Sequence, residues 1–363
     1  MNILNVTSIV EWRGGDAQMY TIYHLLKKYP EFNQYILCPN SSVLFEKGTN
    51  EGENIIGYQR KNKVFSLVKP IIELVKSLNI TVLHIHDSSA LSAALLAKPF
   101  LPKNCKIIYS RKRNNPIKSG LSKKWKYNSP WIYKIVSVSK AVEQIYRDID
   151  TPDSKLQTIY DAIDVKQFAN NPKTHLIHKE MGWDVSTKII GNVASLTDQK
   201  DLITFIETAE KIVEQENNVR FVIIGKGEKE ADLKTLVASK NLTEYIIFLG
   251  FKKNVADYLN EFDILLMTSI SEGLPLVIYE AFASRVPIVS TNAGGIAEVV
   301  ISGENGFVTP LKAVDQLANH CLSILNNDDL KRQFQEKSFE LVNKQFDLKN
   351  LEENYYQFYK SIK

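Results

Sequence analysis

Short apolar runs rich in β-branched residues alternate along this chain with longer stretches in which apolar side chains recur at helical spacing. The runs are typical of buried strands, and the longer stretches are typical of helices that cover a sheet. In the first half the pattern predicts strands at 3–7, 81–85, 107–110 and 135–137, and helices at 17–28 and 90–97. This alternation favours a parallel sheet with helical crossovers.

The same pattern starts again at residue 188. It predicts strands at 188–193, 220–224, 245–249, 264–268 and 288–290, and helices at 202–216, 231–240, 255–260 and 276–283. A chain of 363 residues exceeds one ordinary hydrophobic core, so we expect two α/β domains. The polar segment 169–175 is the expected hinge because it separates the two patterned regions.

The end of the chain predicts one more helix. Asp347 is a suitable N-cap residue, and the apolar residues that follow fall along one helix face. These residues are Leu351, Tyr355, Phe358 and Ile362. Such a stripe needs a groove in which to bury its side chains.

The composition excludes several classes of protein. Hydrophobic residues make up 44% of the chain and charged residues 24%, as in an ordered globular protein. No apolar run approaches the roughly 18–20 residues of a membrane span, and the first residues form a predicted strand instead of a basic signal peptide, so we expect a cytoplasmic protein. The cysteines, Cys38, Cys105 and Cys321, lack CxxC spacing, which argues against a disulfide framework and a zinc site.

Positive charge is concentrated in the segment 88–142, which has no acidic residue although the whole chain carries only +4. Its basic residues are Lys98, Lys103, Lys106, Arg111, Lys112, Arg113, Lys118, Lys123, Lys124, Lys126, Lys134 and Lys140, with Trp125, Tyr127, Trp131 and Tyr133 among them. Such a block attracts an anionic acceptor or an anionic membrane surface, and an ordinary solvated face is the alternative. Nucleic acid is not an expected partner, because no RNP-like, helix-turn-helix or KH pattern accompanies the charge.

The segment EGLPLVIYE at 272–280 carries the clearest chemical signal. It follows one predicted strand and opens a predicted helix. Gly273 lets the loop approach a ligand closely, and Pro275 suits the first helical turn. The next free amides, those of Leu276 and Val277, would then face an anion, for which a diphosphate is the natural candidate.

Two carboxylates frame this segment. Glu272 lies in the loop, where it would reach the hydroxyls of a sugar. Glu280 lies about one turn into the helix, where it would accept hydrogen bonds from ribose hydroxyls. Together the two side chains would hold both ends of a sugar nucleotide.

The E-x7-E spacing of Glu272 and Glu280 resembles the signature of the retaining glycosyltransferases of family 4, which have the GT-B fold. Further segments resemble those of the family in the same order. They are GNVASLTDQKD at 191–201, VIIGKG at 222–227, FLGF at 248–251, GGIAEVV at 294–300 and GENGFV at 303–308. The resemblance covers nearly the whole chain and is strongest over the second half.

The resemblance implies an α/β architecture of two Rossmann-like domains whose parallel sheets face a central cleft. Residues 1–168 would bind the acceptor, residues 169–345 would bind the nucleotide-sugar donor, and the helix in 346–363 would cross back onto the N-terminal domain. The two domains would close to assemble the site and to exclude water.

The family also implies roles for single residues. Lys200 stands where the family has a lysine that contacts the donor diphosphate, and Ser195 occupies the position of a frequent arginine. The expected catalytic residues are Glu272, which would orient the sugar, and His86, which would touch it. The expected donor-binding residues are Gly15, Lys200, Leu274, Leu276, Val277 and Glu280, and the expected acceptor contacts are Trp12, Arg111 and Arg113.

Two local features have competing interpretations. Gly14 and Gly15 stand between the first strand and the first helix, as a glycine loop of the family does, although a tight turn without a ligand would have the same sequence. His84 and His86 face the same side of their strand, but a metal would need a third ligand, so we expect a packed His84 and no metal. The resemblance likewise implies no metal and no other cofactor for the chemistry.

The expected function is transfer of a sugar, with retention of configuration, from a UDP- or GDP-sugar to a glycan or a lipid-linked acceptor in cell-surface polysaccharide or lipopolysaccharide biosynthesis. The basic, aromatic-rich segment favours an acceptor at the cytoplasmic face of the membrane. Two alternatives are a GT-B sugar-nucleotide epimerase and a non-catalytic partner subunit. The intact set of Lys200, Glu272 and Glu280 favours the transferase over both.

Overall fold

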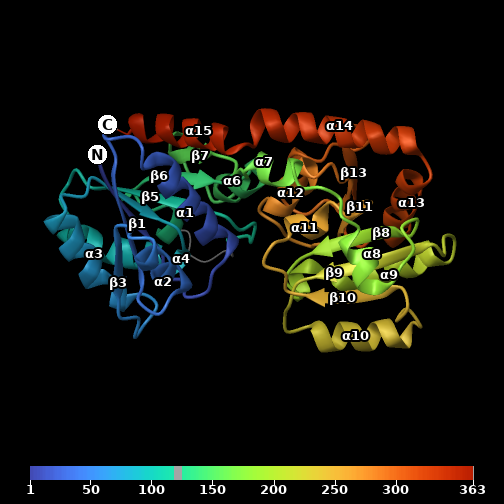
Figure 1. The fold of residues 1–363 in the computed structure, drawn as a ribbon. Helices are drawn as coiled ribbons and strands as arrows, with labels where there is room; N and C mark the ends of the chain where they lie inside the picture. The colour runs from blue at the N-terminus through green and yellow to red at the C-terminus, as the bar shows by residue number, and fades with distance from the viewer. Residues whose placement is uncertain (118–124, 363) are drawn as a thin grey trace. The chain divides into compact units, whose positions relative to one another are not determined.

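The computed structural model describes residues 1–117 and 125–362. Its contacts divide the chain into two compact units, one formed by Met1–Asp161 with Lys349–Lys363 and the other by Ala162–Leu348. The division falls ahead of the boundary expected at 168/169, because helix α7 (Val165–Ala169) packs against α12 (Leu276–Ala283) of the second unit. Each unit contains one parallel sheet with helices packed on it, as the alternating pattern predicts (Figure 1).

The first unit is built on a seven-stranded parallel sheet with the order β3-β2-β1-β4-β5-β6-β7. Its strands are β1 (Asn2–Val6), β2 (Asn33–Pro39), β3 (Ile55–Tyr58), β4 (Val82–Ile85), β5 (Lys106–Arg111), β6 (Ile132–Ser137) and β7 (Leu156–Thr158). The strand order reverses at β1, which lies between β2 and β4. Open α/β sheets bind ligands outside the carboxyl ends of the strands at such a point.

The helices of the first unit differ in whether a side chain caps their first turn. They are α1 (Gly14–Leu26), α2 (Val43–Asn50), α3 (Phe65–Ser77), α4 (Ser88–Ala97), α6 (Lys140–Arg147) and, from the end of the chain, α15 (Leu348–Lys360). Ser42, Asp87 and Ser139 accept hydrogen bonds from amides in the first turns of α2, α4 and α6. These caps satisfy donors that a helix leaves free at its start.

Helix α15 buries its apolar stripe within the first unit, in the way that its spacing predicts. Leu351, Tyr355 and Phe358 on the helix are each less than one-tenth exposed, and so is Ile362, which lies just beyond the end of the helix at Lys360. Beside them, the Tyr359 hydroxyl lies 2.6 Å from His84 Nδ1. The helix therefore completes the core of the first unit although it is about 200 residues removed in sequence from the last strand of that sheet.

The second unit has a six-stranded parallel sheet with the order β10-β9-β8-β11-β12-β13. Its strands are β8 (Lys188–Val193), β9 (Val219–Ile224), β10 (Ile246–Gly250), β11 (Ile264–Met267), β12 (Ile288–Thr291) and β13 (Gly306–Thr309). The order reverses at β8, so the carboxyl ends of β8 and β11 border the expected ligand position of this sheet.

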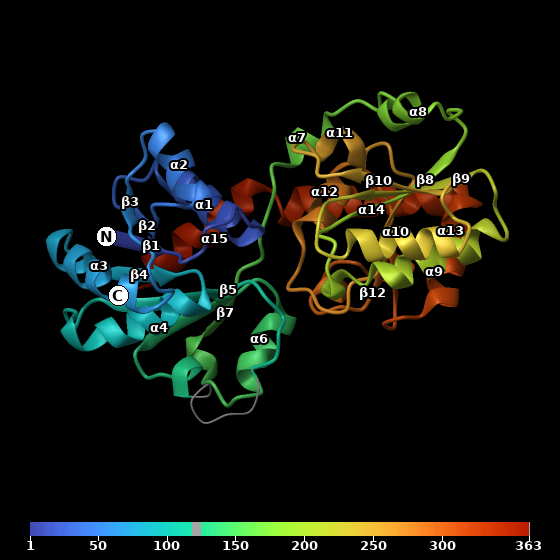
Figure 2. The same ribbon diagram turned by 90° about the horizontal axis from the view of Figure 1, so that it is seen from below.

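Helices cover this second sheet as well. Besides α7 and α12 they are α8 (Leu176–Met181), α9 (Leu202–Val213), α10 (Glu230–Ser239), α11 (Ala256–Leu259), α13 (Val314–Leu325) and α14 (Asp328–Gln345). Helices α9, α10 and α13 share one core cluster with the strands, and Figure 2 shows them alongside one another. Within the described residues, no helix combines the length and the apolar character needed to cross a membrane.

Candidate active site

The carboxyl ends of β8 and β11 carry the two residues at the centre of the candidate donor site. Lys200 ends the short 3-10 turn after β8, and Glu272 lies in the loop after β11. The Lys200 Nζ donates a hydrogen bond to Glu272 Oε1 at 2.5 Å, and the two side chains are 19% and 8% exposed. The fold thus joins a cation and a carboxylate that stand 72 positions apart in the chain.

Hydrogen bonds fix the backbone around Lys200 against β11 and the loop that follows it. The Thr268 hydroxyl lies 3.1 Å from the carbonyl oxygen of Lys200 and 2.9 Å from that of Asp201. The amide of Ile270 donates to the carbonyl of Gln199 at 2.9 Å. These contacts hold the backbone of Lys200 in place, and such preorganisation favours a charged site.

The loop of Glu272 is also held on its other side. The Thr291 hydroxyl, at the end of β12, donates to the Ser269 carbonyl at 2.6 Å, and the Gly295 amide donates to the Gly273 carbonyl at 3.1 Å. The segment after β12 that resembles the GG-x-x-E-x-V motif of the family therefore supports the Glu272 loop directly.

Helix α12 begins beside this loop with free amides. Pro275 is its N-cap and has an extended backbone. The expectation that Pro275 belongs to the first helical turn is therefore wrong by one residue, because the helix begins at Leu276. No side chain caps this helix. The amides of Leu276 and Val277 precede the first residue that can bond back within the helix, and they form an end suited to an anion.

Glu280 lies one turn into α12, and its environment differs from that of Glu272. Its side chain is half-buried, and burial raises the pKa of the Glu280 carboxyl to about 7. Glu272 instead has the Lys200 ammonium as its partner. The two carboxyl groups that frame the motif therefore differ: Glu272 has a charged neighbour, whereas Glu280 is desolvated.

Two glycines after β9 bring a third loop close to the site. A Cβ atom on Gly225, whose φ is +144°, would lie 1.8 Å from the Ala194 carbonyl oxygen, and one on Gly227 would lie 2.2 Å from the Leu196 carbonyl oxygen. Only glycine permits this approach. Ser195, where the family frequently has arginine, is exposed between these two contact points.

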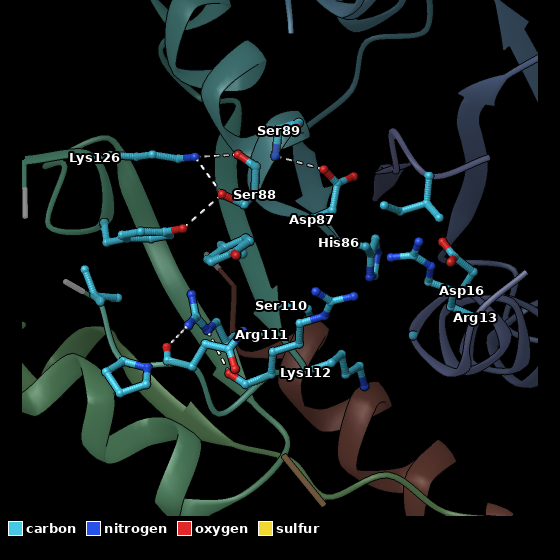
Figure 3. Close-up of a pocket in the computed structure, with 18 residues that line it drawn as sticks. Arg13, Asp16, His86, Asp87, Ser88, Ser89, Ser110, Arg111, Lys112 and Lys126 are labelled. Carbon is cyan, nitrogen blue, oxygen red and sulfur yellow. Dashed lines mark hydrogen bonds between the residues drawn. The ribbon is translucent and has the colours of Figure 1, made fainter. Parts of the chain in front are cut away.

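The first unit has a separate pocket of about 560 Å³ at the carboxyl ends of β1, β4 and β5 (Figure 3). Four of the residues expected in a site line it, namely Gly15, His86, Arg111 and Arg113. Trp12, which was expected to contact the acceptor, is not among the lining residues. It is 39% exposed and packs edge-on against Tyr20.

His86 lines this pocket with a defined hydrogen-bonding state. Its Nε2 lies 3.0 Å from Asn5 Oδ1, which can only accept, so Nε2 carries the proton. Burial holds the pKa of the His86 imidazole well below its ordinary value, so the ring is neutral. Its Nδ1 has no hydrogen-bond partner among the described residues and is left as an acceptor.

His84 differs from His86 in that both of its ring nitrogens are used. Its Nδ1 contacts the Tyr359 hydroxyl, and its Nε2 lies 2.8 Å from the Ser110 hydroxyl. Burial lowers the pKa of the His84 imidazole to about 3. His84 is a packed structural residue, as its position in the strand predicts.

Arg111 is engaged by its own loop. Its Nε donates to the Arg113 carbonyl at 3.0 Å, a second nitrogen donates to the Asn115 carbonyl, and its guanidinium lies over the rings of Tyr127 and Tyr146. It is only 8% exposed. Arg111 therefore shapes the pocket wall, whereas Arg113 is exposed.

Pattern reasoning did not single out two acidic residues in this pocket. Asp16 accepts a hydrogen bond from the Thr7 hydroxyl, and burial raises the pKa of its carboxyl to about 6. Asp87 joins the loop after β1 to the start of α4, because it accepts bonds from both the amide and the hydroxyl of Ser8. An acidic residue in the first turn of a helix is common, so the sequence alone did not distinguish Asp16.

Gly14 and Gly15 are the first two residues of α1 and do not form a separate turn before it. Space for a side chain exists at Gly14, and a Cβ atom on Gly15 would lie 3.7 Å from Lys112 Cγ, an ordinary contact. The structure thus places Gly15 at the pocket without a steric demand for glycine. Of the basic segment, Lys118, Lys123 and Lys124 lie outside the described residues.

Two family models match consecutive parts of the chain. The model described as Glycosyltransferase Family 4 matches residues 21–167, and the model described as Glycosyl transferases group 1 matches residues 174–341. Together they cover most of the chain, including every loop of the candidate donor site.

Curated relatives and solved structures agree with this assignment. The chain is 25% identical to N-acetyl-alpha-D-glucosaminyl L-malate synthase of Bacillus anthracis over 310 residues, which is 82% of this chain and 79% of that protein. It is 28% identical over 192 residues to UDP-Gal:alpha-D-GlcNAc-diphosphoundecaprenol alpha-1,3-galactosyltransferase of Escherichia coli, covering 51% of this chain and 48% of that one.

Among solved structures, Anabaena HepE in complex with UDP and glucose aligns with a TM-score of 0.86 and 16% identity over 99% of this chain and 100% of that chain. A glycosyltransferase from Rickettsia africae aligns with a TM-score of 0.85 and 21% identity over 99% and 98% of the two chains. These likenesses establish a shared fold. The chain therefore belongs to the family 4 glycosyltransferases, with two Rossmann-like units of the GT-B type.

Proposed function

We propose that this glycosyltransferase moves a sugar from a nucleotide-sugar donor, a UDP-sugar before a GDP-sugar, to a glycan or lipid-linked acceptor, with retention of configuration and without a catalytic metal. The observation that carries the proposal is the Lys200–Glu272 ion pair beside the free amino end of α12. The UDP complex of Anabaena HepE supports placing UDP-sugars first.

The reaction needs stabilisation of negative charge on the departing diphosphate. The positive groups that stabilise this negative charge are the Lys200 ammonium, after β8, and the amides of Leu276 and Val277, at the start of α12. A helix end contributes roughly 0.3–1 kcal/mol when exposed and up to about 2 kcal/mol when partly buried. With Ser195 in place of a second cation, most of the charge stabilisation falls to Lys200.

The carboxylates position the donor. Glu280 accepts hydrogen bonds from the ribose hydroxyls, and Glu272 orients the sugar hydroxyls and stabilises positive charge that develops on the ring. Neutral His86 accepts a hydrogen bond from a sugar hydroxyl through its free Nδ1. The departing phosphate removes the acceptor proton on the same face, which accounts for retention without an enzymic nucleophile.

The pocket of the first unit supports an anionic acceptor. Its lining includes four basic side chains beside Arg111 and two acidic ones. The basic residues are Arg13, Lys112, Arg113 and Lys126, and the acidic residues are Asp16 and Asp87. The acceptor of the Escherichia coli relative, a diphosphoundecaprenol-linked sugar by that protein's name, is of this chemical class. Such an acceptor would place the protein peripherally at the cytoplasmic membrane face, in surface polysaccharide or lipopolysaccharide synthesis.

The proposal is tested by incubating the protein with UDP-, GDP- and ADP-sugars, with and without EDTA, and with sugar diphosphate lipids as acceptors. Release of one nucleoside diphosphate, increased by a lipid-linked acceptor and insensitive to EDTA, is the expected result. NMR of the product should show the anomeric configuration of the donor. Conversion of a donor to another sugar nucleotide without an acceptor would instead identify an epimerase.

A further inference from the structure

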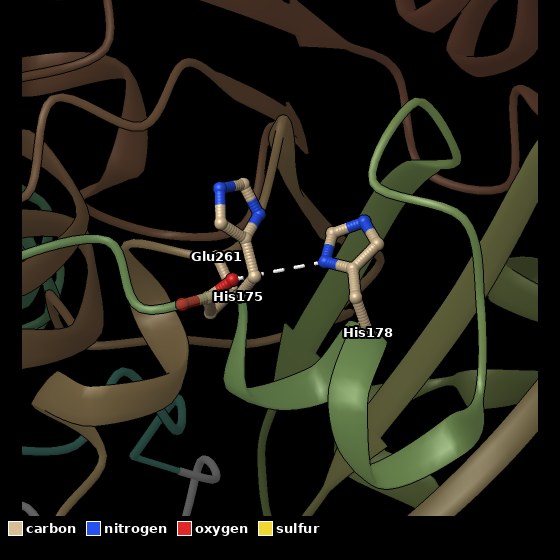
Figure 4. Close-up of side chains that lie close together, drawn as sticks. All are labelled: His175, His178 and Glu261. Atoms are coloured by element: carbon tan, nitrogen blue, oxygen red, sulfur yellow. Dashed lines mark ion pairs between the residues drawn. The ribbon is translucent and has the colours of Figure 1, made fainter.

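Three side chains that the donor site does not use converge at the opposite end of the second sheet (Figure 4). His175 precedes helix α8 as its N-cap, His178 lies one turn further, and Glu261 lies between α11 and β11. One ring nitrogen of each histidine and one carboxylate oxygen of Glu261 lie within 4.8 Å of one another. Glu261 precedes β11 and Glu272 follows it, so the cluster and the donor site lie at opposite ends of one strand.

Each of the three side chains has one buried polar atom without a hydrogen-bond partner among the described residues. His175 Nδ1, His178 Nδ1 and Glu261 Oε2 are each buried and unpaired. The His178 side chain is 3% exposed and that of Glu261 is 0% exposed. Buried polar atoms are nearly always paired, so three unpaired polar atoms in one cluster of side chains require an explanation.

The neighbouring hydrogen bonds determine which atoms are available as ligands. His178 Nε2 lies 3.0 Å from the Thr187 carbonyl oxygen, so Nε2 carries a proton, and in the neutral tautomer the lone pair is on Nδ1. Glu261 Oε1 accepts a hydrogen bond from the Thr174 amide at 2.9 Å, which leaves Oε2 free. Metal-bound histidines have this arrangement, with the second nitrogen donating to a carbonyl or carboxylate.

The charge of Glu261 also favours a bound cation. Among the described residues, the only ion-pair partner of Glu261 is His178, whose Nδ1 lies 3.8 Å from Glu261 Oε2. The hydrogen bond from His178 to Thr187 is compatible with a neutral ring, which would leave a fully buried carboxylate without a counter-charge. A divalent cation would neutralise the carboxylate and occupy both nitrogen lone pairs.

We propose that His175, His178 and Glu261 bind a structural zinc ion, with the fourth position open to water. Two imidazoles and one carboxylate are an established zinc donor set. Ligands about 2.0 Å from a tetrahedral zinc are about 3.3 Å apart, so the 3.8 Å pair needs little movement and the remaining atoms must approach more closely. The ion fastens residues 174–178, at the start of α8, to the turn that precedes β11.

The test uses full-length protein without an affinity tag, treated with a chelator and exchanged into metal-free buffer. Calorimetric titration with zinc chloride should show one ion bound per chain, and zinc should raise the melting temperature. His175→Gln, His178→Gln and Glu261→Gln should each weaken zinc binding more than tenfold. His24→Gln is the matched control, because His24 also lies 3.8 Å from a glutamate oxygen but is 38% exposed on the surface of the first unit.

A measurement on the native protein does not depend on whether the variants fold. In nitrogen NMR of isotope-labelled histidine, zinc should shift the Nδ1 signals of two histidines while the Nε2 of His178 stays protonated. Absence of one tightly bound zinc, or equal zinc binding by the native protein and all three cluster variants, overturns the proposal. The three residues would then form a metal-free His178–Glu261 pair.

Discussion

At the residue scale, the two carboxyl groups of the candidate donor site differ in their environments. Glu272 has a lysine partner, whereas burial alone raises the pKa of Glu280 from 4.5 to about 7. Between these two pH values the folded protein binds more protons at Glu280 than the unfolded chain does. The free energy of unfolding therefore falls as the pH rises from about 4.5 through about 7.

Glu280→Gln tests this consequence. The variant removes the cost of ionising a desolvated carboxyl, so it should be more stable than the native protein at pH 8, by on the order of 2 kcal/mol. At pH 4 the two proteins should have nearly equal stability, because Glu280 is protonated in both states. Urea denaturation at the two pH values measures the difference, and exposed Glu304→Gln serves as the control. A gain that is the same at both pH values would contradict the raised pKa.

At the element scale, the loop after β9 requires glycine where it approaches the loop after β8 in the candidate donor site. A methyl group at Gly225 would overlap the Ala194 carbonyl, and φ is +144° there. We expect Gly225→Ala to lower the free energy of unfolding by roughly 2–4 kcal/mol, from overlap together with backbone strain.

Gly303→Ala is the matched control in the same unit. Its φ is +81°, and nothing lies within 4 Å of an added Cβ atom, so only backbone strain of roughly 1–2 kcal/mol is expected. Denaturant unfolding compares the two variants. An equal decrease in the free energy of unfolding of both variants would show that the contact with Ala194 does not require glycine at position 225.

The contact between Tyr359 of helix α15 and His84 leads to a second prediction at the element scale. Tyr359→Phe removes the hydroxyl that lies 2.6 Å from His84 Nδ1 in a fully buried position. The unpaired nitrogen should cost about 1–3 kcal/mol of stability. Tyr356→Phe removes a more accessible bond to Glu31 and should cost less, because water can replace the lost partner. A reversed order in thermal or urea unfolding would contradict the proposed packing of α15.

The sequence predicted elements best where apolar character and length were both clear. Residues 188–193 and 276–283 match β8 and α12 to the residue. Strands β2, β3, β7 and β13 were not predicted; β7 has only three residues, and β13 is short and begins with glycine. Helix α14 was missed because it is largely polar and buries only Phe334, Ser338 and Val342.

The candidate site was also predicted only in part from the sequence. The motif and the family resemblance located Lys200 and Glu272, but the ion pair between them depends on the neighbouring positions of β8 and β11 in the sheet. Local patterning could not reveal Glu261 beside His175 and His178, because a turn ahead of β11 supplies it. Asp16 was likewise hidden, since its burial is a property of the packed unit.

At the scale of the whole molecule, the chain passes from the first unit to the second after Asp161 and returns after Leu348. Each unit has a buried core of its own. The residues proposed to bind the donor diphosphate and ribose, Lys200, Leu276, Val277 and Glu280, lie in the second unit, and the Lys200–Glu272 pair is at the centre of this candidate site. Damage to that pair should therefore abolish sugar transfer without loss of the fold.

The most direct measurement of this claim compares initial rates of nucleoside diphosphate release by the native protein, Lys200→Ala, Glu272→Gln and Lys331→Ala. Lys331 is the matched control, because it also forms a 2.5 Å pair with a carboxylate, Asp263, and is 20% exposed. We expect the first two variants to lose on the order of a hundredfold or more in rate, and Lys331→Ala to keep the native rate while folded. Near-native rates in Lys200→Ala and Glu272→Gln would contradict the account.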